Sequence, residues 1–282
     1  MGGIGMDFNI LEALLYAFVS GLTEILPVSS VAHQALLIEL FNADANVNLL
    51  NFMIHAGIFV ALWITCGTQL RRAYFNYKKT QNRRRSRRQY DIQGVMDYQL
   101  VKTILTPLFI SFILFAITRT FVKPIYLVSI FFLVNGIILH FPMYMSHGNK
   151  DARGMSRLDG ALVGIGSILS AFPGISRNGT IISFSISRGA APAHALRWSL
   201  FLALPAVVVL MGYDIFAMFT VGLGGIGAPE VIQAVLGAGA SFLGTVVAVS
   251  VMKILTQSAN FLNFAYYSYG AALFSFILWL YI

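Results

Sequence analysis

The sequence predicts an all-α integral membrane protein with about six transmembrane helices and two re-entrant helix pairs. Of its 282 residues, 57% are hydrophobic and only 11% are charged, and the mean hydropathy is +0.76. Soluble domains usually carry about 25% charged residues. The apolar runs reach the roughly 20 residues that an α-helix needs to cross a bilayer, whereas a β-barrel would show alternating segments of about ten. These runs cover residues 48–70, 100–118, 123–145, 195–219, 229–252 and 261–282.

The first short helix pair is predicted over residues 8–41, before the first full span. Pro27 ends its first arm, because proline cannot continue a helix. Ser29 or Ser30 is then expected to cap a second short helix over about 31–41. Two short helices joined at a Pro-Ser-Ser turn are typical of a re-entrant hairpin. Such irregular backbone at membrane depth is tolerated only where protein or a polar cavity covers it.

A strongly basic segment follows the first span. The net charge is +8, and ten of the nineteen Lys and Arg residues lie between Arg71 and Lys102. The positive-inside rule predicts that the loop 71–99 is cytoplasmic. Two spans separate it from the second basic loop, 146–157, so both loops should lie on the same side. A nucleic-acid-binding arm is the alternative for such a charge run, and we do not favour it; no nucleic-acid partner is expected.

The second half of the chain repeats the order of elements in the first half. Residues 158–191 form another short arm, a break that contains proline and a further short arm, and three spans follow them. When the halves are overlaid at an offset of 146, Pro27 falls on Pro173 and Ser30 falls on Ser176. The match lies in the order of the elements more than in residue identity.

This order predicts two repeats of opposite orientation, over residues 1–146 and 147–282. Each consists of a re-entrant pair followed by three spans. Because three is an odd number, the second half should enter the membrane from the opposite face. In transporters such an inverted repeat places the ligand site near the membrane midplane, where the repeats meet.

One carboxylate in the first break stands out from its apolar surroundings. Glu24 is interpreted as the only acidic residue well inside an apolar run, where an ionised group costs roughly 2.5–3.5 kcal/mol on insertion scales. It could hold a divalent cation or act as general base on water or a hydroxyl. The alternative is a structural ion pair with Arg177 of the second break.

The two breaks together predict an anion site inside the membrane. Each break precedes a short helix, and helix N-termini offer free N–H donors and partial positive charge that suit phosphate. Arg177 adds a planar fork of donors that matches phosphate oxygens. Gly174 lets the backbone approach a ligand closely. A lipid phosphate or diphosphate is the natural occupant.

His33 lies three residues after Ser30 on the same helix face, so it is a candidate acid, base or nucleophile. A packed core histidine is the alternative. Ser29, Ser30 and Ser176 are also more often helix caps than nucleophiles. His55, in the first span, could face the same cavity or simply pack against its neighbours.

At these residues the chain resembles a known family. The run 21–30 followed by His33 closely resembles the first signature of the undecaprenyl-diphosphate phosphatase family, also called the bacitracin-resistance family. Residues 173–177 resemble its second signature, and the resemblance covers essentially the whole chain. That family removes the terminal phosphate of undecaprenyl diphosphate at the outer face of the bacterial membrane, which recycles the lipid carrier for peptidoglycan synthesis.

The resemblance implies a set of residue roles and partners. Glu24, Ser30 and His33 would be catalytic, and Glu24 would also bind a divalent cation, Mg²⁺ or Ca²⁺. The chain would lie in a bacterial inner membrane with a polyprenyl diphosphate and membrane lipids as partners, and a homodimer is a further prediction. The substrate-binding set would be Ser20, Ser29, Gly174, Ser176, Arg177, Asn178 and Thr180.

The chain departs from the family pattern at Ser20. Ser20 stands where the family has the first glutamate of a Glu-x-x-x-Glu pair, so one of two carboxylates is missing. This loss favours a flippase or transporter that carries a lipid phosphate without hydrolysis. The retention of Glu24, Ser30 and His33 favours a hydrolase, and we expect the hydrolase.

Overall fold

The computed structural model describes residues 8–43, 47–81, 92–121, 124–145, 148–221, 227–257 and 263–281. Over these residues the chain is helical, with a single isolated β-bridge and no strand. Six helices in this part of the chain are long and apolar enough to cross a membrane, so the predicted all-α, multi-pass membrane protein is confirmed. They cover Asn48–Lys78, Val95–Thr118, Ile125–Tyr144, Pro192–Thr220, Ala228–Thr256 and Phe264–Tyr281.

The helices follow the predicted order of two short arms and three spans, twice. The short arms run for 11 to 16 residues, too short to cross a bilayer alone. In chain order the elements are α1 (Ile10–Ile25), α2 (Ser30–Leu40), α3 (Asn48–Leu62), the π-helical turn η1 (Trp63–Gly67), α4 (Thr68–Gln81), α5 (Ile92–Phe121), α6 (Ile125–His140), the 3₁₀ turn η2 (Phe141–Tyr144), α7 (Arg157–Ser167), the 3₁₀ turn η3 (Ile168–Ala171), α8 (Arg177–Ser187), α9 (Pro192–Val221), α10 (Ala228–Gln257) and α11 (Phe264–Tyr281).

The first break lies between α1 and α2, around Pro27. α1 begins with a capping box in which Asn9 and Glu12 bond to each other's backbone N–H groups. Ser29 stands at the predicted cap position of α2, but its side chain does not cap the helix. Ser30 is already the first helical residue, and the Ser29 side chain makes no capping bond because it bonds to the second break instead.

The second break lies between α7 and α8. α7 begins with a capping box of Ser156 and Asp159, and Asp159 also forms an ion pair of 2.7 Å with Arg188 at the end of α8. This ion pair joins the start of α7 to the end of α8. α8 begins one residue earlier than predicted, and Ser176 caps it by accepting the N–H of Gly179 at 3.1 Å.

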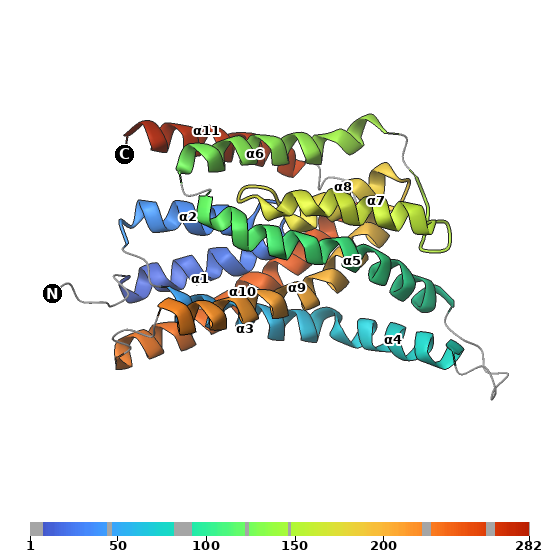
Figure 1. The fold of residues 1–282 in the computed structure, drawn as a ribbon, viewed down its shortest axis with the longest axis horizontal. Coiled ribbons are helices and arrows are strands. Elements are labelled where there is room, and N and C mark those ends of the chain that lie inside the picture. Colours follow the sequence, from blue (N-terminus) through green and yellow to red (C-terminus); the bar gives the residue numbers. More distant parts are fainter. Residues whose placement is uncertain are drawn as a thin grey trace.

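The two short pairs approach each other from opposite ends of the molecule (Figure 1). The α1–α2 pair starts and ends at the left of the view, the α7–α8 pair starts and ends at the right, and α1 packs along α10 while α7 packs along α5. Both breaks therefore lie in the interior. Re-entrant insertion and the repeat boundaries, 1–146 and 147–282, stay predictions.

Close helix contact holds α1 in place. A Cβ at Gly21 would clash with the backbone of Ser241 in α10, and Gly21 O accepts a 3.1 Å hydrogen bond from the Thr245 hydroxyl. Small residues commonly allow such close approach between membrane helices. By contrast, α6 and α11 pack mainly against each other and form the uppermost layer in Figure 1.

The predicted basic loop 71–99 is shorter than expected. α4 continues the first span through Arg71 to Gln81, and α5 already begins at Ile92, so both ends of that stretch are helical. Arg83, Arg84, Arg85, Arg87 and Arg88 lie outside the described residues. The described ends of the basic segment lie at the same end of the molecule as residues 148–156, on the right of Figure 1.

Candidate active site between the two helix breaks

A cavity of about 60 Å³ lies where the two breaks meet. Five of the predicted site residues line it, and they come from both halves of the chain: Glu24, Ser29, Ser30, Ser176 and Arg177. Sequence reasoning therefore placed the acidic and the basic break correctly against each other. The walls are apolar apart from these groups and a few hydroxyls, so charges inside them interact strongly.

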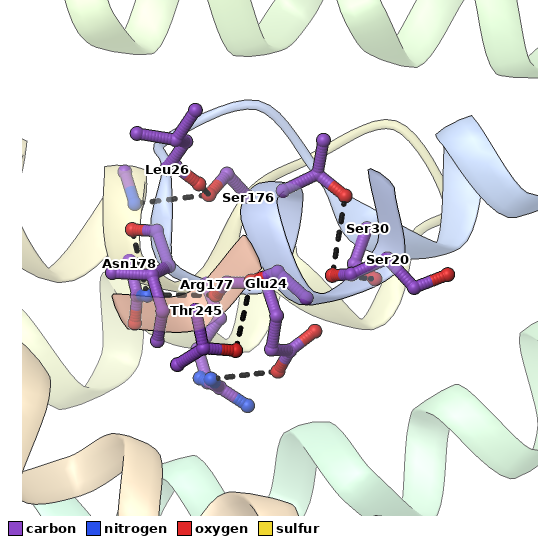
Figure 2. Close-up of polar contacts among 12 residues, drawn as sticks. Ser20, Glu24, Leu26, Ser30, Ser176, Arg177, Asn178 and Thr245 are labelled. Carbon is purple, nitrogen blue, oxygen red and sulfur yellow. Dashed lines mark hydrogen bonds and ion pairs between the residues drawn. The ribbon is translucent and has the colours of Figure 1, made fainter. Parts of the chain in front are cut away.

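The Glu24 carboxylate and the Arg177 guanidinium point toward each other across this cavity (Figure 2). Arg177 Nη2 donates to Glu24 Oε1 at 2.9 Å, and the side chains are only 11% and 8% exposed. This is the ion pair that the sequence offered as an alternative role for Glu24. However, the buried Arg177 Nε has no hydrogen-bond partner among the described residues. A buried donor without a partner is costly, so the guanidinium has unused capacity for an anion.

The start of α8 is fastened to the end of α1. Asn178 Nδ2 donates to Glu24 O and Ile25 O, at 2.9 and 3.1 Å, which satisfies two carbonyls of the last turn of α1. Ser176 Oγ donates to Leu26 O at 3.4 Å. Figure 2 shows Ser176 beside Leu26 and Asn178 beside the α1 backbone. These bonds place Glu24 next to Arg177.

Ser29 forms a second link between the breaks. Its Oγ accepts the N–H of Gly174 at 3.1 Å, and its own φ is +64°, a conformation that non-glycine residues rarely adopt. Gly174 has φ +116°, which only glycine adopts readily, and a Cβ there would meet Phe131. Backbone strain of this kind concentrates at functional sites.

Four predicted substrate-binding residues do not line the cavity. Ser20 is fully buried, donates to Tyr16 O at 2.7 Å and accepts from Gln34. Thr180 donates to Arg177 O within α8, at 2.8 Å. Asn178 and Gly174 act as described above, through the backbone of the breaks. These four residues therefore bond to other parts of the protein and do not face the cavity.

The predicted catalytic residue His33 also lies outside the cavity lining. Its Nδ1 contacts Ser29 O at 2.7 Å, and its Nε2 contacts the Tyr267 hydroxyl at 2.7 Å. A carbonyl only accepts, so Nδ1 carries the proton, and Tyr267 donates to Nε2 of the neutral ring. His33 therefore orients Ser29 through its backbone carbonyl, and both nitrogens of the ring are hydrogen-bonded.

His55 does not line the cavity. The prediction that Glu24 is the only acidic residue well inside an apolar run is wrong. Asp214, within α9, is 2% exposed and contacts His55 Nδ1 at 2.6 Å. Sequence reasoning missed Asp214 because it lies near the end of an apolar run. Leu210, one turn earlier on α9, does line the cavity.

Sequence reasoning also missed several cavity residues. Ser111 is the one with a recognisable pattern, since it is a polar residue in the apolar stretch after Pro107 of α5. Thr23 could have been predicted because it directly precedes Glu24 in the sequence. Pro173 and Ile175 belong to the second break, which the sequence already indicated, and the remaining lining residues, which no sequence pattern distinguishes, are Val31, Phe112, Phe115, Ser170, Phe172 and Leu210.

The described residues do not fit a resident metal ion by themselves. Among them no group of three or more His, Cys, Asp or Glu side chains could hold a metal. Glu24 is the single carboxylate among the described residues that line the cavity, and one of its oxygens already accepts from Arg177.

Comparison with known proteins decides which family this arrangement belongs to. Residues 13–274 match the family described as Bacitracin resistance protein BacA. The chain belongs to this family. A family relative from Thermotoga sp. (strain RQ2), called Undecaprenyl-diphosphatase, is 29% identical over 264 residues, which cover 94% of this chain and 98% of the relative.

Two further relatives carry the same name. The protein of Carboxydothermus hydrogenoformans is 29% identical over 261 residues, covering 92% of this chain and 93% of the relative. That of Methanococcus maripaludis (strain C7) is 24% identical over 264 residues, covering 94% and 98%. The family match, residues 13–274, therefore includes both breaks, the first five spans and part of the sixth.

Proposed function

We propose that this chain is a membrane phosphatase that hydrolyses undecaprenyl diphosphate, or a related polyprenyl diphosphate, to the monophosphate and phosphate. Membership of the family and the name shared by its relatives support this activity. The observation that carries the proposal to particular residues is the partnerless Arg177 Nε, buried beside Glu24 in the cavity between the breaks. It is a donor placed for an anion in an otherwise apolar protein.

Substrate binding would exchange one anion for another at Arg177. The terminal phosphate would take the free Nε and compete with Glu24 for Nη2, because phosphate oxygens match the guanidinium fork bidentately. The N-terminus of α8 and the Ser29, Ser30 and Ser176 hydroxyls would bind the remaining oxygens. Glu24, once released from the ion pair, would accept a proton more readily.

The reaction would then be an in-line displacement at the terminal phosphorus. The attacking oxygen, from water or from Ser30, forms a bond to phosphorus while its proton passes to Glu24. The bond from phosphorus to the bridging oxygen breaks, and the lipid monophosphate leaves. Arg177 neutralises charge on the transferred group, which is where catalysis of phosphoryl transfer mostly acts. If Ser30 attacks, water must release the phosphate in a second step.

The location that suits this proposal is a bacterial inner membrane, with the basic segment after α4 in the cytoplasm. The cations that flank it favour that side by the positive-inside rule. Recycling of the lipid carrier for cell-wall synthesis would follow from hydrolysis in that membrane. A homodimer stays a prediction.

A divalent cation, Mg²⁺ or Ca²⁺, is proposed only as an ion that the diphosphate helps to bind. Glu24 provides one carboxylate, and Mg²⁺ often uses one or two carboxylates together with substrate phosphates. We therefore expect EDTA to slow phosphate release without changing the thermal unfolding midpoint of the lipid-free protein. A drop in that midpoint would reveal a resident metal and contradict the joint site.

The test is phosphate release from undecaprenyl diphosphate by the purified protein in detergent. Arg177→Lys keeps the charge but loses the fork, and Glu24→Gln keeps the shape but loses the base, so each should lower kcat/KM by at least about 100-fold. Glu39→Gln and Arg153→Lys change the same residue types at exposed positions and should leave the rate unchanged.

The outcomes separate hydrolysis from carriage of the lipid. Turnover that Arg177→Lys and Glu24→Gln remove, and the two surface controls do not, would establish the phosphatase and its site. Binding of the lipid that depends on Arg177, with no phosphate release under any cation condition, would overturn the enzyme and leave a carrier. The family and its named relatives favour hydrolysis.

A further inference from the structure

Asn135 is a fully buried amide in the middle of the apolar helix α6. Its Nδ2 donates to Pro27 O at 3.0 Å and to the Ser268 hydroxyl of α11 at 2.9 Å. Its Oδ1 accepts the N–H of Ser176 at 2.9 Å. The side chain thus uses both of its donor hydrogens and its acceptor, each at good hydrogen-bonding distance.

The bonds of Asn135 go to both helix breaks at once. Pro27 O belongs to the first break and the Ser176 N–H to the second, and neither group is part of a regular helical hydrogen bond. Within a membrane such backbone groups must be satisfied by protein, because lipid offers no donors or acceptors. One side chain therefore satisfies a carbonyl from the acidic break and an amide from the basic break.

The same face of α6 supports the breaks by packing. Phe131 contacts the position where Gly174 lacks a side chain, and its ring stacks on that of Phe172 with centroids 4.8 Å apart. Phe132 meets the ring of His33 edge-on, at 5.3 Å. Among the described residues that line the cavity, however, none belongs to α6. The helix thus acts on the site through the breaks, without touching its contents.

We infer that Asn135 is a positioning residue that sets the spacing and register of the two breaks, and so holds Glu24 in reach of Arg177. The inference rests on the proposed function, because the two groups it aligns are those of the phosphatase site. Pro27 is three residues after Glu24, and Ser176 directly precedes Arg177, so a shift of either anchor moves a reacting group. The asparagine amide can do this because it carries a donor and an acceptor on the same short side chain, so it donates to one anchor and accepts from the other.

The main test compares Asn135→Leu with the parent protein. Leucine keeps the number and branching of the side-chain heavy atoms but removes all three bonds, and displacements of about 1 Å in a catalytic site can cost 100-fold in rate. We expect kcat for undecaprenyl diphosphate to fall by about 10- to 100-fold, with a smaller change in KM. Val128→Ala is the control, since it weakens the buried apolar contacts of α6 without touching either break. It should lower the unfolding midpoint yet keep kcat within about twofold.

A double-mutant comparison separates positioning from mere stability. If Asn135 acts by aligning Arg177, then Asn135→Leu should cost less than about twofold in residual rate once Arg177 is already replaced by Ala. A purely structural role would give the same fold-loss in both backgrounds and would overturn the inference. Asn135→Gln, which keeps the polar groups one methylene farther out, provides a milder variant if the leucine protein does not fold, and it should also lower kcat more than Val128→Ala.

Failure of the inference and failure of the proposed function can be told apart. A parent that hydrolyses the lipid while Asn135→Leu and Asn135→Gln match Val128→Ala would overturn the role of Asn135 alone. A parent without turnover would overturn the phosphatase. In that event the affinity for inorganic diphosphate, measured by calorimetry, replaces the rate: weaker binding in the Asn135 variants than in Val128→Ala supports the positioning role, and equal binding contradicts it.

Discussion

At the scale of single residues, the site is built from side chains that satisfy the backbone of broken helices. Ser29, Asn178 and Asn135 each bond to a main-chain group of the opposite half or of a break, and each is buried. Isolated polar groups in a membrane would be unfavourable. These side chains are hydrogen-bonded, and their bonds fix the positions of Glu24 and Arg177. The polar residues of the motifs therefore serve mostly to hold two charged groups in place.

Ser29→Ala should weaken the link between the breaks. It removes the acceptor of the buried Gly174 N–H, and an unpaired buried donor costs about 1–3 kcal/mol. We expect a lower midpoint of thermal unfolding in detergent and slower phosphate release. Ser187→Ala is the matched control, because the Ser187 hydroxyl bonds only within its own helix, to Ser183 O. Equal unfolding midpoints for Ser29→Ala and Ser187→Ala would show that the hydrogen bond to Gly174 does not contribute to the stability of the fold.

At the scale of elements, the short arms are stabilised by capping at their outer ends and by close helix contact along their length. The capping boxes at Asn9 and Ser156 begin α1 and α7, the two arms that lead into the breaks. Gly21 then lets α1 approach α10. Both devices act locally, and each can be altered without touching the cavity.

Gly21→Ala should destabilise α1 against α10. The new methyl group would clash with the backbone of Ser241, and overpacking of this kind costs about 1–3 kcal/mol. At Gly212, an exposed helical position, a Cβ meets nothing within 4 Å, so Gly212→Ala should be neutral or stabilising by about 0.5–1 kcal/mol. Gly21→Ala should therefore lower the unfolding midpoint, whereas Gly212→Ala should leave it unchanged or raise it. A tolerated Gly21→Ala would argue against the close approach.

Asp159 should make a contribution to stability that disappears in acid. Burial tends to raise its pKa, but hydrogen bonds from Ser156 and Arg188 outweigh this and hold the pKa of Asp159 below its ordinary value of 3.8. The contribution is therefore present above pH 3.8 and is lost as the pH falls through the lower, folded-state pKa. The unfolding midpoint of the parent should exceed that of Asp159→Asn at pH 7, and the gap should narrow below pH 3.8. A gap independent of pH would exclude the carboxylate charge as its source.

The element pattern was predictable from sequence, whereas the partners of the break residues were not. Pro27 and Pro173, with the lengths of the apolar runs, predicted where the short helices stop. Ser29 takes the predicted cap position, but its hydroxyl bonds to Gly174, 145 residues away, and not to its own helix, and the local sequence carries no trace of that contact. Asn135 was missed because its partners in the breaks are also far away in the sequence, and a single amide in an apolar run shows no periodic pattern.

At the scale of the whole molecule, a buried acid–imidazole pair joins the two halves. His55 belongs to α3 of the first half and Asp214 to α9 of the second, and their side chains are 9% and 3% exposed. α3 and α9 also pack against each other directly. His55–Asp214 is thus a second ion pair between the halves, in addition to Glu24–Arg177 at the cavity. His55 does not replace the carboxylate that is missing at Ser20, because its imidazole is already bound to Asp214.

His55 and Asp214 should depend on each other for their contributions to the stability of the chain. His55→Leu or Asp214→Leu alone leaves an unpaired ionisable group in the interior, which typically costs about 3–5 kcal/mol. The double leucine variant should lose less than the sum, with an interaction energy of about 1–3 kcal/mol from a cycle of unfolding measurements. The exposed pair Arg153–Asp151, treated with alanine in the same cycle, should give below about 1 kcal/mol. Additive losses at His55 and Asp214 would mean that the contact does not couple the halves, and α3 and α9 would then be held by apolar packing alone.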